Sequence, residues 1–218
     1  QWGNLLSGVE LIRKKENAEV YAMTAPLLIN KSTGRKFGKS EGSAVWLDEA
    51  KTSVYAFYQF WLNTDDESAI DYMKIFTMLD RQTIDAVAEN HAVNPGARSA
   101  QKILAREVTD IVHGVARRES VERVTEVLFG DAPLQSLTDQ DIELLTHEIP
   151  QAPVGRRVVE ALTDSGVARS NGEARRLLAA GAISLDGVKI TDDQLISQPA
   201  LIKKGKNTFI VVTKGGER

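Results

Sequence analysis

Two lysines, three glycines and a serine lie close together in the ten-residue stretch TGRKFGKSEG, Thr33–Gly42. Such a composition suits a loop that holds phosphate groups, because glycine lets the backbone bend and lysine places a mobile positive charge on a long stem. A P-loop requires the pattern G-x-x-x-x-G-K-[ST]. Only three residues separate Gly34 from Gly38, so the stretch is not a P-loop. It is a flexible basic loop, and its function depends on the residues around it.

A second group of candidate residues lies in the last third of the chain. Ser170 and Glu173 form the start signal of a helix whose apolar side consists of alanine and leucine. Arg175 and Arg176 therefore point away from the core, and Arg169 lies just before the cap, where the helix N-terminus adds a positive partial charge. A solvated helix face explains this pattern equally well. The candidate contacts to an RNA phosphate backbone are Arg156, Arg169, Arg175, Arg176, Lys189, Lys203, Lys204 and Lys206.

Charge is distributed unevenly along the chain. Residues 151–218 contain 11 Lys and Arg against 7 Asp and Glu, a net charge of +4. The whole chain has a net charge of −3, so residues 1–150 have a net charge of −7. A basic C-terminal part on an acidic body is typical of a protein with an anionic partner, although asymmetry of this size also arises by chance.

Composition excludes several classes of protein. The chain has 218 residues, 42% hydrophobic and 26% charged, as expected for a soluble protein of one large domain or two ordinary ones. No apolar run approaches the roughly 18 residues of a membrane span. The absence of cysteine excludes disulfides and thiolate metal sites and fits a reducing compartment. His91, His113 and His147 lack the spacing of a zinc site, so we expect no protein-bound metal.

The first fifty residues lead into the basic loop. Gln1-Trp2-Gly3-Asn4 contains neither an initiator methionine nor a signal-peptide core, so we expect the sequence to begin within a longer protein. The spacing of apolar residues predicts a helix over residues 4–15. The run 20–29 suits a buried strand or an extended segment, which delivers the chain directly into the loop.

The pattern is helical from about residue 51 to residue 147. Thr64 and Glu67 read as a capping box, and Thr138 and Asp139 as a further helix start. We expect the aromatic residues of the first helix to lie in the core. The predicted helices cover residues 54–62, 69–76, 103–112, 121–128 and 141–145.

The pattern changes after a linker predicted at Pro150–Pro153. A helix over residues 156–164 and the helix that starts at Ser170 precede a hairpin, in which Asp186-Gly187 is the turn. A further strand covers residues 208–212. The sequence therefore predicts a mainly α chain followed by a small α+β domain.

Four landmarks resemble those of bacterial tyrosyl-tRNA synthetases, in the same order. QWGN at residues 1–4 resembles the segment that lines their adenylate site, and residues 27–48 resemble the class I KMSKS signature in its K-F-G-K-[ST] form. YQFWLNTDD at residues 58–66 resembles the start of their helical anticodon-binding domain. Residues 168–192 resemble the RNA-binding domain named after the fourth protein of the small ribosomal subunit. The chain is thus similar to the C-terminal half of such an enzyme, and the half with the HIGH motif is missing.

The resemblance implies three domains. Residues 1–50 would be the end of a Rossmann-like catalytic domain with the KFGKS loop, residues 51–149 a helical anticodon-binding domain, and residues 150–218 an S-four-like RNA-binding domain. It also implies that Lys36 and Lys39 are catalytic and that Gln1 contacts the adenylate. The ATP-binding residues would be Lys36, Phe37, Gly38, Lys39 and Ser40.

By this resemblance the chain is part of a cytoplasmic tyrosine–tRNA ligase, which activates tyrosine with ATP and Mg²⁺ and transfers it to tRNA(Tyr). The full-length enzyme would be a homodimer away from membranes, and this chain alone is expected to be inactive. One alternative is a non-catalytic RNA-binding module of residues 51–218, and another is an S-four-like factor that acts on ribosomes. Lys36, Lys39 and QWGN favour the ligase, because an RNA-binding module needs none of them.

Overall fold

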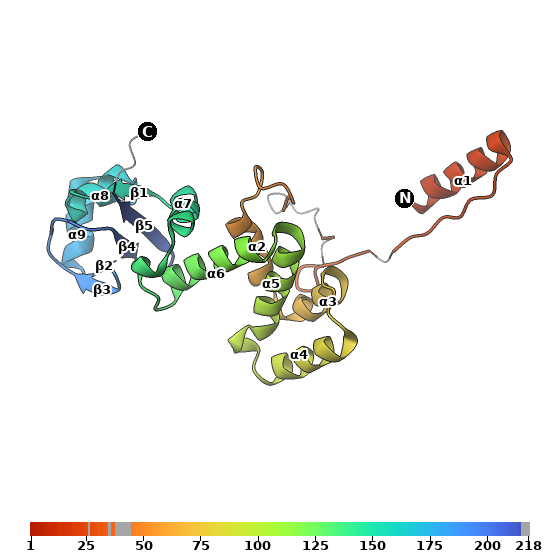
Figure 1. The fold of residues 1–218 in the computed structure, drawn as a ribbon, viewed down its shortest axis with the longest axis horizontal. Helices are drawn as coiled ribbons and strands as arrows, with labels where there is room; N and C mark the ends of the chain where they lie inside the picture. The colour runs from red at the N-terminus through yellow and green to blue at the C-terminus, as the bar shows by residue number, and fades with distance from the viewer. Residues whose placement is uncertain (26, 35, 38–44, 215–218) are drawn as a thin grey trace. The chain divides into compact units, whose positions relative to one another are not determined.

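The computed structural model describes residues 1–25, 27–34, 36–37 and 45–214. Contacts within the chain divide it into two compact units, Gln1–Ala44 and Val45–Arg218. Figure 1 labels the helices and strands of each unit. Within the described residues, no helix has both the length and the apolarity that a bilayer crossing requires.

The described residues of the first unit form one helix and an extended segment. α1 (Trp2–Glu16) confirms the predicted helix and ends where Asn17 takes a left-handed conformation, with φ 48°. All residues of α1 are described, and none is buried. The residues after it are extended, but Tyr21 and Met23 are 85% and 93% exposed. This segment is therefore the extended alternative of the prediction and not a buried strand.

Helices form the second unit as far as residue 148, which confirms the helical pattern predicted from the sequence. The helices are α2 (Val54–Leu62), α3 (Asp66–Phe76), α4 (Arg81–Val93), α5 (Ser99–His113), α6 (Val115–Phe129) and α7 (Asp139–Glu148). Two 3-10 turns, η1 (Pro95–Ala97) and η2 (Leu134–Ser136), connect them. The sequence analysis did not predict α4, which buries only Ile84 and His91 and so shows little apolar periodicity.

Side-chain caps stand at the start of α2, α3, α4 and α7. Asp65 caps α3, since its carboxylate accepts the Ser68 N–H at 2.9 Å. The capping box predicted to start at Thr64 is therefore wrong by one residue. At α7 the predicted start is confirmed, because Thr138 and Asp141 form a reciprocal capping box.

The aromatic side of α2 lies in the core, as predicted. Phe57, Tyr58 and Trp61 are buried. The Phe57 ring meets the Trp61 ring edge-on at 6.1 Å and the His113 imidazole at 4.7 Å, with interplanar angles of 67° and 84°. Edge-to-face pairs of this kind add to the stabilisation that burial gives.

The C-terminal part is a sheet with helices packed on it. Its strands are β1 (Gln151–Pro153), β2 (Ile183–Leu185), β3 (Val188–Ile190), β4 (Ala200–Lys204) and β5 (Thr208–Thr213), and its helices are α8 (Val158–Asp164) and α9 (Asn171–Ala179). The described strands lie in the order β1-β5-β4-β2-β3, with β1 parallel to β5 and the other pairs antiparallel. The predicted hairpin is confirmed, and its turn residues Asp186 and Gly187 both have positive φ, 46° and 81°.

The linker prediction at residues 150–153 is wrong. Gln151–Pro153 form β1, which pairs with β5, and Ala152 is buried at 3% exposure. Proline is tolerated there because β1 is an edge strand. The chain thus enters the sheet directly after α7.

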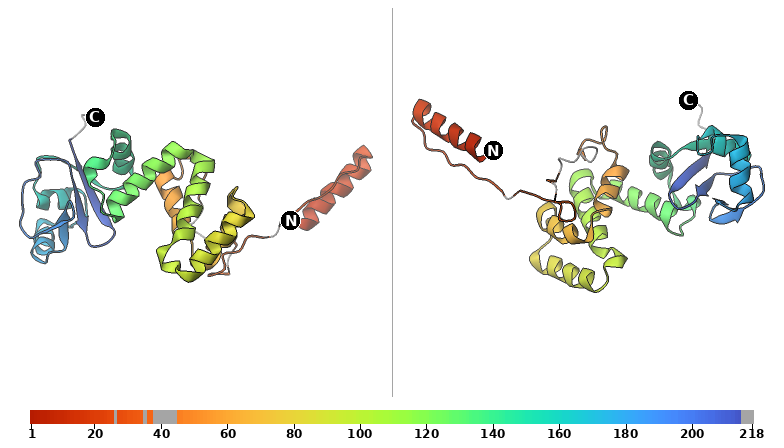
Figure 2. Two further views of the ribbon diagram at one scale, coloured as in Figure 1. Left: turned by 60° about the horizontal axis from the view of Figure 1, so that its bottom comes forward. Right: turned by 180° about the vertical axis from the view of Figure 1, so that it is seen from behind.

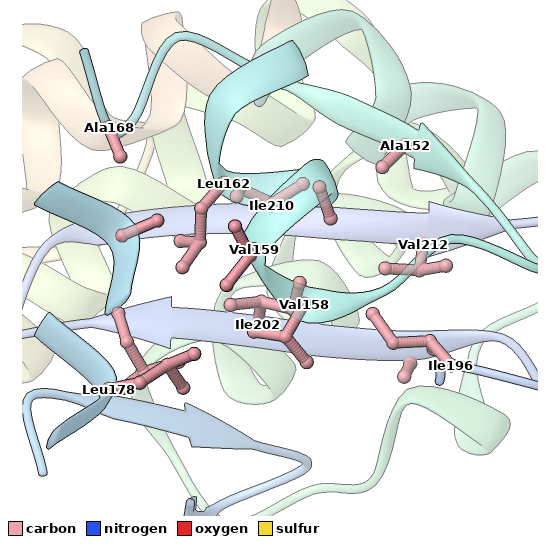
Figure 3. Packing of buried hydrophobic residues seen from close by; sticks show 14 residues of the cluster. Ala152, Val158, Val159, Leu162, Ala168, Leu178, Ile196, Ile202, Ile210 and Val212 are labelled. Carbon is pink, nitrogen blue, oxygen red and sulfur yellow. The ribbon is translucent and has the colours of Figure 1, made fainter. Parts of the chain in front are cut away.

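One face of the sheet packs against α8 and α9. Alternate residues of a strand point to opposite faces, so Ile202, Ile210 and Val212 share this face. They pack with Val159 of α8 and Leu178 of α9 in a core whose members are all at most 3% exposed (Figure 3).

The opposite face packs against α6 and α7, and Figures 1 and 2 show these helices on the other side of the sheet from α8 and α9. Leu201, Phe209 and Val211 of the sheet contact a cluster that includes Leu128 of α6 and Leu145 of α7. The helical part and the C-terminal sheet therefore share a second hydrophobic core.

A buried carboxylate joins α6 to α7. The side chain of Asp141 is 0% exposed and accepts two hydrogen bonds from Arg123, at 2.8 and 2.9 Å. It also accepts the Ser120 hydroxyl and the Thr138 N–H. Burial raises the pKa of Asp141, but the bonds from Arg123, Ser120 and Thr138 outweigh it and hold the pKa well below its usual range.

Candidate functional site

The base of the basic loop is a tight turn. Asn30 Oδ1 accepts the Thr33 N–H at 2.9 Å, and the Asn30 carbonyl accepts the Gly34 N–H at 2.8 Å. Gly34 has φ 67°, a conformation in which a side chain would be strained. The loop therefore starts from a fixed geometry that requires glycine at this position.

This turn brings Lys36 back beside the incoming chain. Lys36 pairs with Ile29 in an isolated antiparallel bridge, and the Phe37 N–H donates to the Leu28 carbonyl at 3.0 Å. Lys36 is exposed and Phe37 is half-buried. The backbone at Lys36 is thus anchored while the side chain is accessible to a ligand, and this is what a phosphate-binding lysine requires.

The other predicted loop residues, Gly38, Lys39 and Ser40, lie outside the described residues. Gln1 is exposed, and its carbonyl accepts the Leu5 N–H at 3.1 Å at the start of α1. The structure therefore gives a position for Lys36, Phe37 and Gln1 of the predicted nucleotide site but no mutual geometry for the set.

Glu49 connects the segment after the loop to the helices of the second unit. Its carboxylate lies 3.6 Å from Nδ1 of His113 and also binds the Arg117 guanidinium. Burial lowers the pKa of His113, Glu49 opposes this shift, and Arg117 adds to it. Burial thus favours the neutral form of the His113 imidazole. The sequence analysis missed Glu49, because its partners lie more than sixty residues away and leave no local pattern.

A hollow of about 660 Å³ lies beside this contact, between the segment at Glu49 and helices α6 and α7. Its lining contains Arg117, His147 and three glutamates. Glu148, at its rim, adds to the effect of burial and raises the pKa of Tyr55 to about 12. The three glutamates outnumber Arg117, so the hollow does not suit an anion, and we assign no ligand to it.

A nearly buried arginine joins α5 to α6. Arg118 donates to Asp110 at 2.9 Å and to Glu122 at 2.8 Å, and its side chain is 8% exposed. Burial lowers the pKa of Arg118, but its bonds to Asp110 and Glu122 raise the pKa by more. Tyr58 donates its hydroxyl to the same Glu122 at 3.3 Å. Every charge in this cluster has a partner of opposite sign, so we regard the cluster as a structural ion-pair network and not as a reactive site.

Two predicted RNA contacts, Arg169 and Arg176, lie beside the N-terminal cap of α9, and a third, Arg175, is in the middle of the helix. Ser170 caps the helix by accepting the Glu173 N–H at 3.2 Å, and Glu173 reaches back to the Arg169 N–H at 2.9 Å. Arg169, Arg175 and Arg176 are exposed. A hollow of about 540 Å³ beside the cap is lined by Arg169, Ser170, Glu173, Arg176 and Leu177. This positive, open surface has the chemistry of a phosphate-binding site.

Two of the predicted lysines lie on the opposite face of the sheet. The register pairs Ser184 with Lys189 on one side and with Lys203 on the other, and Lys203 with Phe209. Residues paired in this way point to the same face, which here is the face of Phe209 that contacts α6. The Lys203 ammonium lies 5.2 Å from the Phe209 ring centroid. Lys189 and Lys203 therefore form a surface separate from α9.

Of the remaining predicted RNA contacts, two interact with other groups of the chain and one is exposed in a turn. Lys204 points to the other face from Lys203 and donates to the Val167 carbonyl at 3.0 Å. Arg156 lies 3.8 Å from Asp164, and Lys206 is exposed in the turn between β4 and β5. The eight basic residues thus do not form one continuous patch, and their contacts to RNA stay predictions. Among the described residues, no cluster of His, Asp or Glu could hold a metal ion.

Comparison with family models gives two matches along the chain. Residues 1–130 match the model described as "tRNA synthetases class I (W and Y)". Residues 141–218 match the model described as "Tyrosine--tRNA ligase SYY-like C-terminal domain". The two matches together span both units of the structure.

Individual relatives agree with the family models. Tyrosine--tRNA ligase 1 of Enterococcus faecalis is 43% identical over 220 residues, which are 99% of this chain and 52% of the relative. Tyrosine--tRNA ligase of Flavobacterium psychrophilum is 42% identical over 232 residues, covering 97% of this chain and 54% of the relative. The chain spans about half the length of the curated relatives it matches.

Among solved structures, a C-terminally truncated mitochondrial tyrosyl-tRNA synthetase of Coccidioides posadasii is 30% identical to this chain. The match covers 56% of this chain and 36% of that one, with a TM-score of 0.46.

Proposed function

The chain belongs to the class I tRNA synthetases for tryptophan and tyrosine, and from this membership we propose that it is part of a tyrosine–tRNA ligase. The ligase would activate tyrosine with ATP and transfer it to tRNA(Tyr). One observation carries the choice of tyrosine over tryptophan: the class I match is followed, in the same chain, by a match to a tyrosine-type C-terminal domain.

The proposed division of labour follows the chain. Residues 1–50 would complete a catalytic domain, residues 51–149 would bind the anticodon arm, and residues 150–218 would be an S-four-like RNA-binding domain. The helices from α2 to α7 and the sheet that follows them support this layout. The full-length ligase would be a homodimer in the cytoplasm, where its tRNA substrate is found.

The chemistry requires positive charge beside the triphosphate of ATP. In the activation step the tyrosine carboxylate attacks the α-phosphate, the bond to pyrophosphate breaks, and negative charge grows on the leaving oxygens. Lys36 and Lys39 would neutralise that charge as it develops, so they would stabilise the transition state more than bound ATP. Mg²⁺ would arrive with the nucleotide and share the charge on its phosphates.

The described part of the loop supports this role. The turn at Asn30 and the bridge at Lys36 fix the backbone, while the Lys36 side chain is exposed. Phe37 would hold the base of the loop, Gly38 and Ser40 would contact phosphate, and Gln1 would line the adenylate site. A lysine on a fixed base loses little backbone entropy when it binds a phosphate.

A second candidate function is a non-catalytic module that binds structured RNA. The compact unit of residues 45–218 favours it, because that unit has its own cores and carries the exposed arginines of α9. This module would need neither ATP nor tyrosine.

Tyrosine-dependent exchange of pyrophosphate into ATP by the full-length protein separates the two functions. We expect exchange with tyrosine and none with tryptophan as the matched control. Chain 1–218 mixed with a separately expressed N-terminal half should recover part of the activity, and alone it should show none. Retained tRNA(Tyr) binding without exchange in the full-length protein would favour the RNA-binding module instead.

A further inference from the structure

We propose that the junction between the end of α6 and the sheet binds an unpaired nucleotide of an RNA loop, with the base in a hollow and its phosphates on Lys189 and Lys203. The inference rests on the proposed tRNA-binding function and names the RNA element that this face would recognise. It assigns paired RNA to the α9 surface and unpaired RNA to the opposite face of the sheet.

The first supporting feature is the row of paired residues across three strands. Lys189, Ser184 and Lys203 are neighbours in register on β3, β2 and β4. Adjacent strands lie about 4.8 Å apart, so the two lysine backbones are separated by roughly 10 Å. Their side chains are long enough to reach consecutive phosphates of a strand that runs across the row. Ser184, between them, offers a hydroxyl to the same strand.

The second feature is a hollow of about 230 Å³ at the end of this row. Lys203 lines it together with Asp131, Gln135 and the hairpin turn at Asp186 and Gly187. The Asp186 carboxylate accepts the Leu201 N–H at 2.8 Å, and this bond holds the hairpin turn in place as one side of the hollow. Asp131 and Gln135 are exposed and can bind the polar edge of a base. Two carboxylates in the hollow repel a phosphate and therefore favour a base inside it, with the phosphates on the lysines outside.

The third feature is an exposed aromatic ring on the residue between Leu128 and Gly130, which both line the hollow. Phe129, the last residue of α6, is 51% exposed. Its ring is held edge-on against the buried Phe209, with centroids 5.3 Å apart and an interplanar angle of 84°. A fixed, exposed ring next to a basic row is the combination by which proteins hold single-stranded nucleic acid, since any base can stack on the ring.

The α9 surface differs in kind. It presents arginines around a helix N-terminus, where charge and backbone N–H groups bind phosphates without reading a base. Lys204, on the α9 face, and Lys203, on the α6 face, are adjacent in sequence. This pair allows the two faces to be tested with the same change of charge.

The test measures the affinity of chain 1–218 for two RNAs. One is the anticodon arm of tRNA(Tyr) with its loop, and the other is the same stem as a continuous duplex without the loop. Phe129→Ala and Lys203→Gln are compared with Lys204→Gln as the matched control, at one fixed salt concentration. Thermal unfolding of each variant confirms that it folds.

We expect Phe129→Ala and Lys203→Gln each to weaken binding of the looped arm about tenfold and binding of the duplex less than twofold. Lys204→Gln should change both affinities by the same factor. Equal losses on both RNAs for Lys203→Gln, or no loss for either variant, would overturn the inference while leaving tRNA binding intact. If the unmodified chain binds neither RNA, the proposed RNA-binding function fails as well.

Discussion

The two ends of the chain differ in where their apolar residues lie. In α1, Trp2 and Leu11 are 52% and 59% exposed, although the helix forms as its sequence predicts. In the C-terminal sheet, Ile202 and Val212 are 1% and 0% exposed. An apolar pattern therefore predicts that a face will be covered, but it does not say by which residues. Helices α6 to α9 cover both faces of the C-terminal sheet, whereas the described residues of the first unit leave every residue of α1 unburied.

The residues proposed to act on ATP and the residues that stabilise the fold therefore lie in different units. The lysines that would act on ATP belong to the unit with exposed apolar residues, and the basic surfaces that would bind RNA belong to the unit with cores. Substitutions in the first unit should thus change activity in the full-length protein. Substitutions in the second should change folding or RNA affinity.

The largest expected effect is on catalysis. Lys39→Ala in the full-length protein should slow tyrosine-dependent pyrophosphate exchange by about 10²- to 10³-fold, because one charge on the leaving phosphates is lost in the transition state. Tyrosine affinity, measured by equilibrium dialysis, should change much less.

Lys51→Ala is the matched control, since the Lys51 ammonium lies over the Trp46 ring at 4.4 Å and outside the loop. It should leave the exchange rate within twofold of the parent. An unchanged rate in Lys39→Ala would remove the loop from the mechanism.

A pair of apolar substitutions tests the contrast in burial directly. Ile202→Ala should lower the free energy of unfolding of chain 1–218 by about 3 kcal/mol, since it empties space in a closed core. Leu11→Ala should lower it by less than about 0.5 kcal/mol, because the leucine is mostly exposed in this chain. Urea unfolding followed by circular dichroism measures both. A large loss for Leu11→Ala would mean that α1 packs against part of this chain after all.

The next effect concerns the ion pair that holds α7 to α6. Asp141→Asn should cost about 2 kcal/mol, the contribution of hydrogen bonds to a charged group. The folded state lowers the pKa of Asp141 below the unfolded value of about 4, so this stability is present above pH 4. It declines as the pH falls further, because the carboxylate must take up a proton.

Urea unfolding at pH 7 and pH 3 tests this sign. The difference in stability between the parent chain and Asp141→Asn should be larger at pH 7 than at pH 3. Ser136→Ala, at an exposed position in η2, is the control for a substitution nearby that leaves the ion pair intact. An equal difference at both pH values would show that the charge on Asp141 contributes nothing to the free energy of unfolding.

Local patterns predicted more of this molecule than long-range ones did. The helices of residues 54–62 and 121–128 and the hairpin at Asp186-Gly187 follow from periodicity and turn chemistry, and all three are present. Pro150–Pro153 looked like a linker because proline usually breaks structure, but partner strand β5 makes Gln151–Pro153 an edge strand. Nothing local to the sequence identifies that partner.

The candidate site shows the same limit. The exposed arginines of α9 could be predicted, since a cap and an apolar side fix which way a helix faces. The separation of Lys203 from Lys204 follows from strand β4, which the sequence analysis did not predict as a strand. The contact of Glu49 with His113 and Arg117 depends on tertiary packing alone.

The smallest predicted effect concerns the α9 surface and the salt dependence of RNA binding. Arg175→Gln should reduce the slope of log affinity against log salt by about one unit if its guanidinium neutralises one phosphate. The loss should be the same for looped and duplex RNA, because the α9 surface is proposed to contact the paired stem that both RNAs contain. Lys102→Gln, which removes an exposed charge from α5, controls for the change in net charge. A slope that is unchanged by Arg175→Gln but reduced by Lys102→Gln would replace the proposed phosphate contact of α9 by one in the helical part. That result would leave the C-terminal sheet with the unpaired nucleotide alone, and it would make the face of Lys203, not that of α9, the principal RNA surface of the domain.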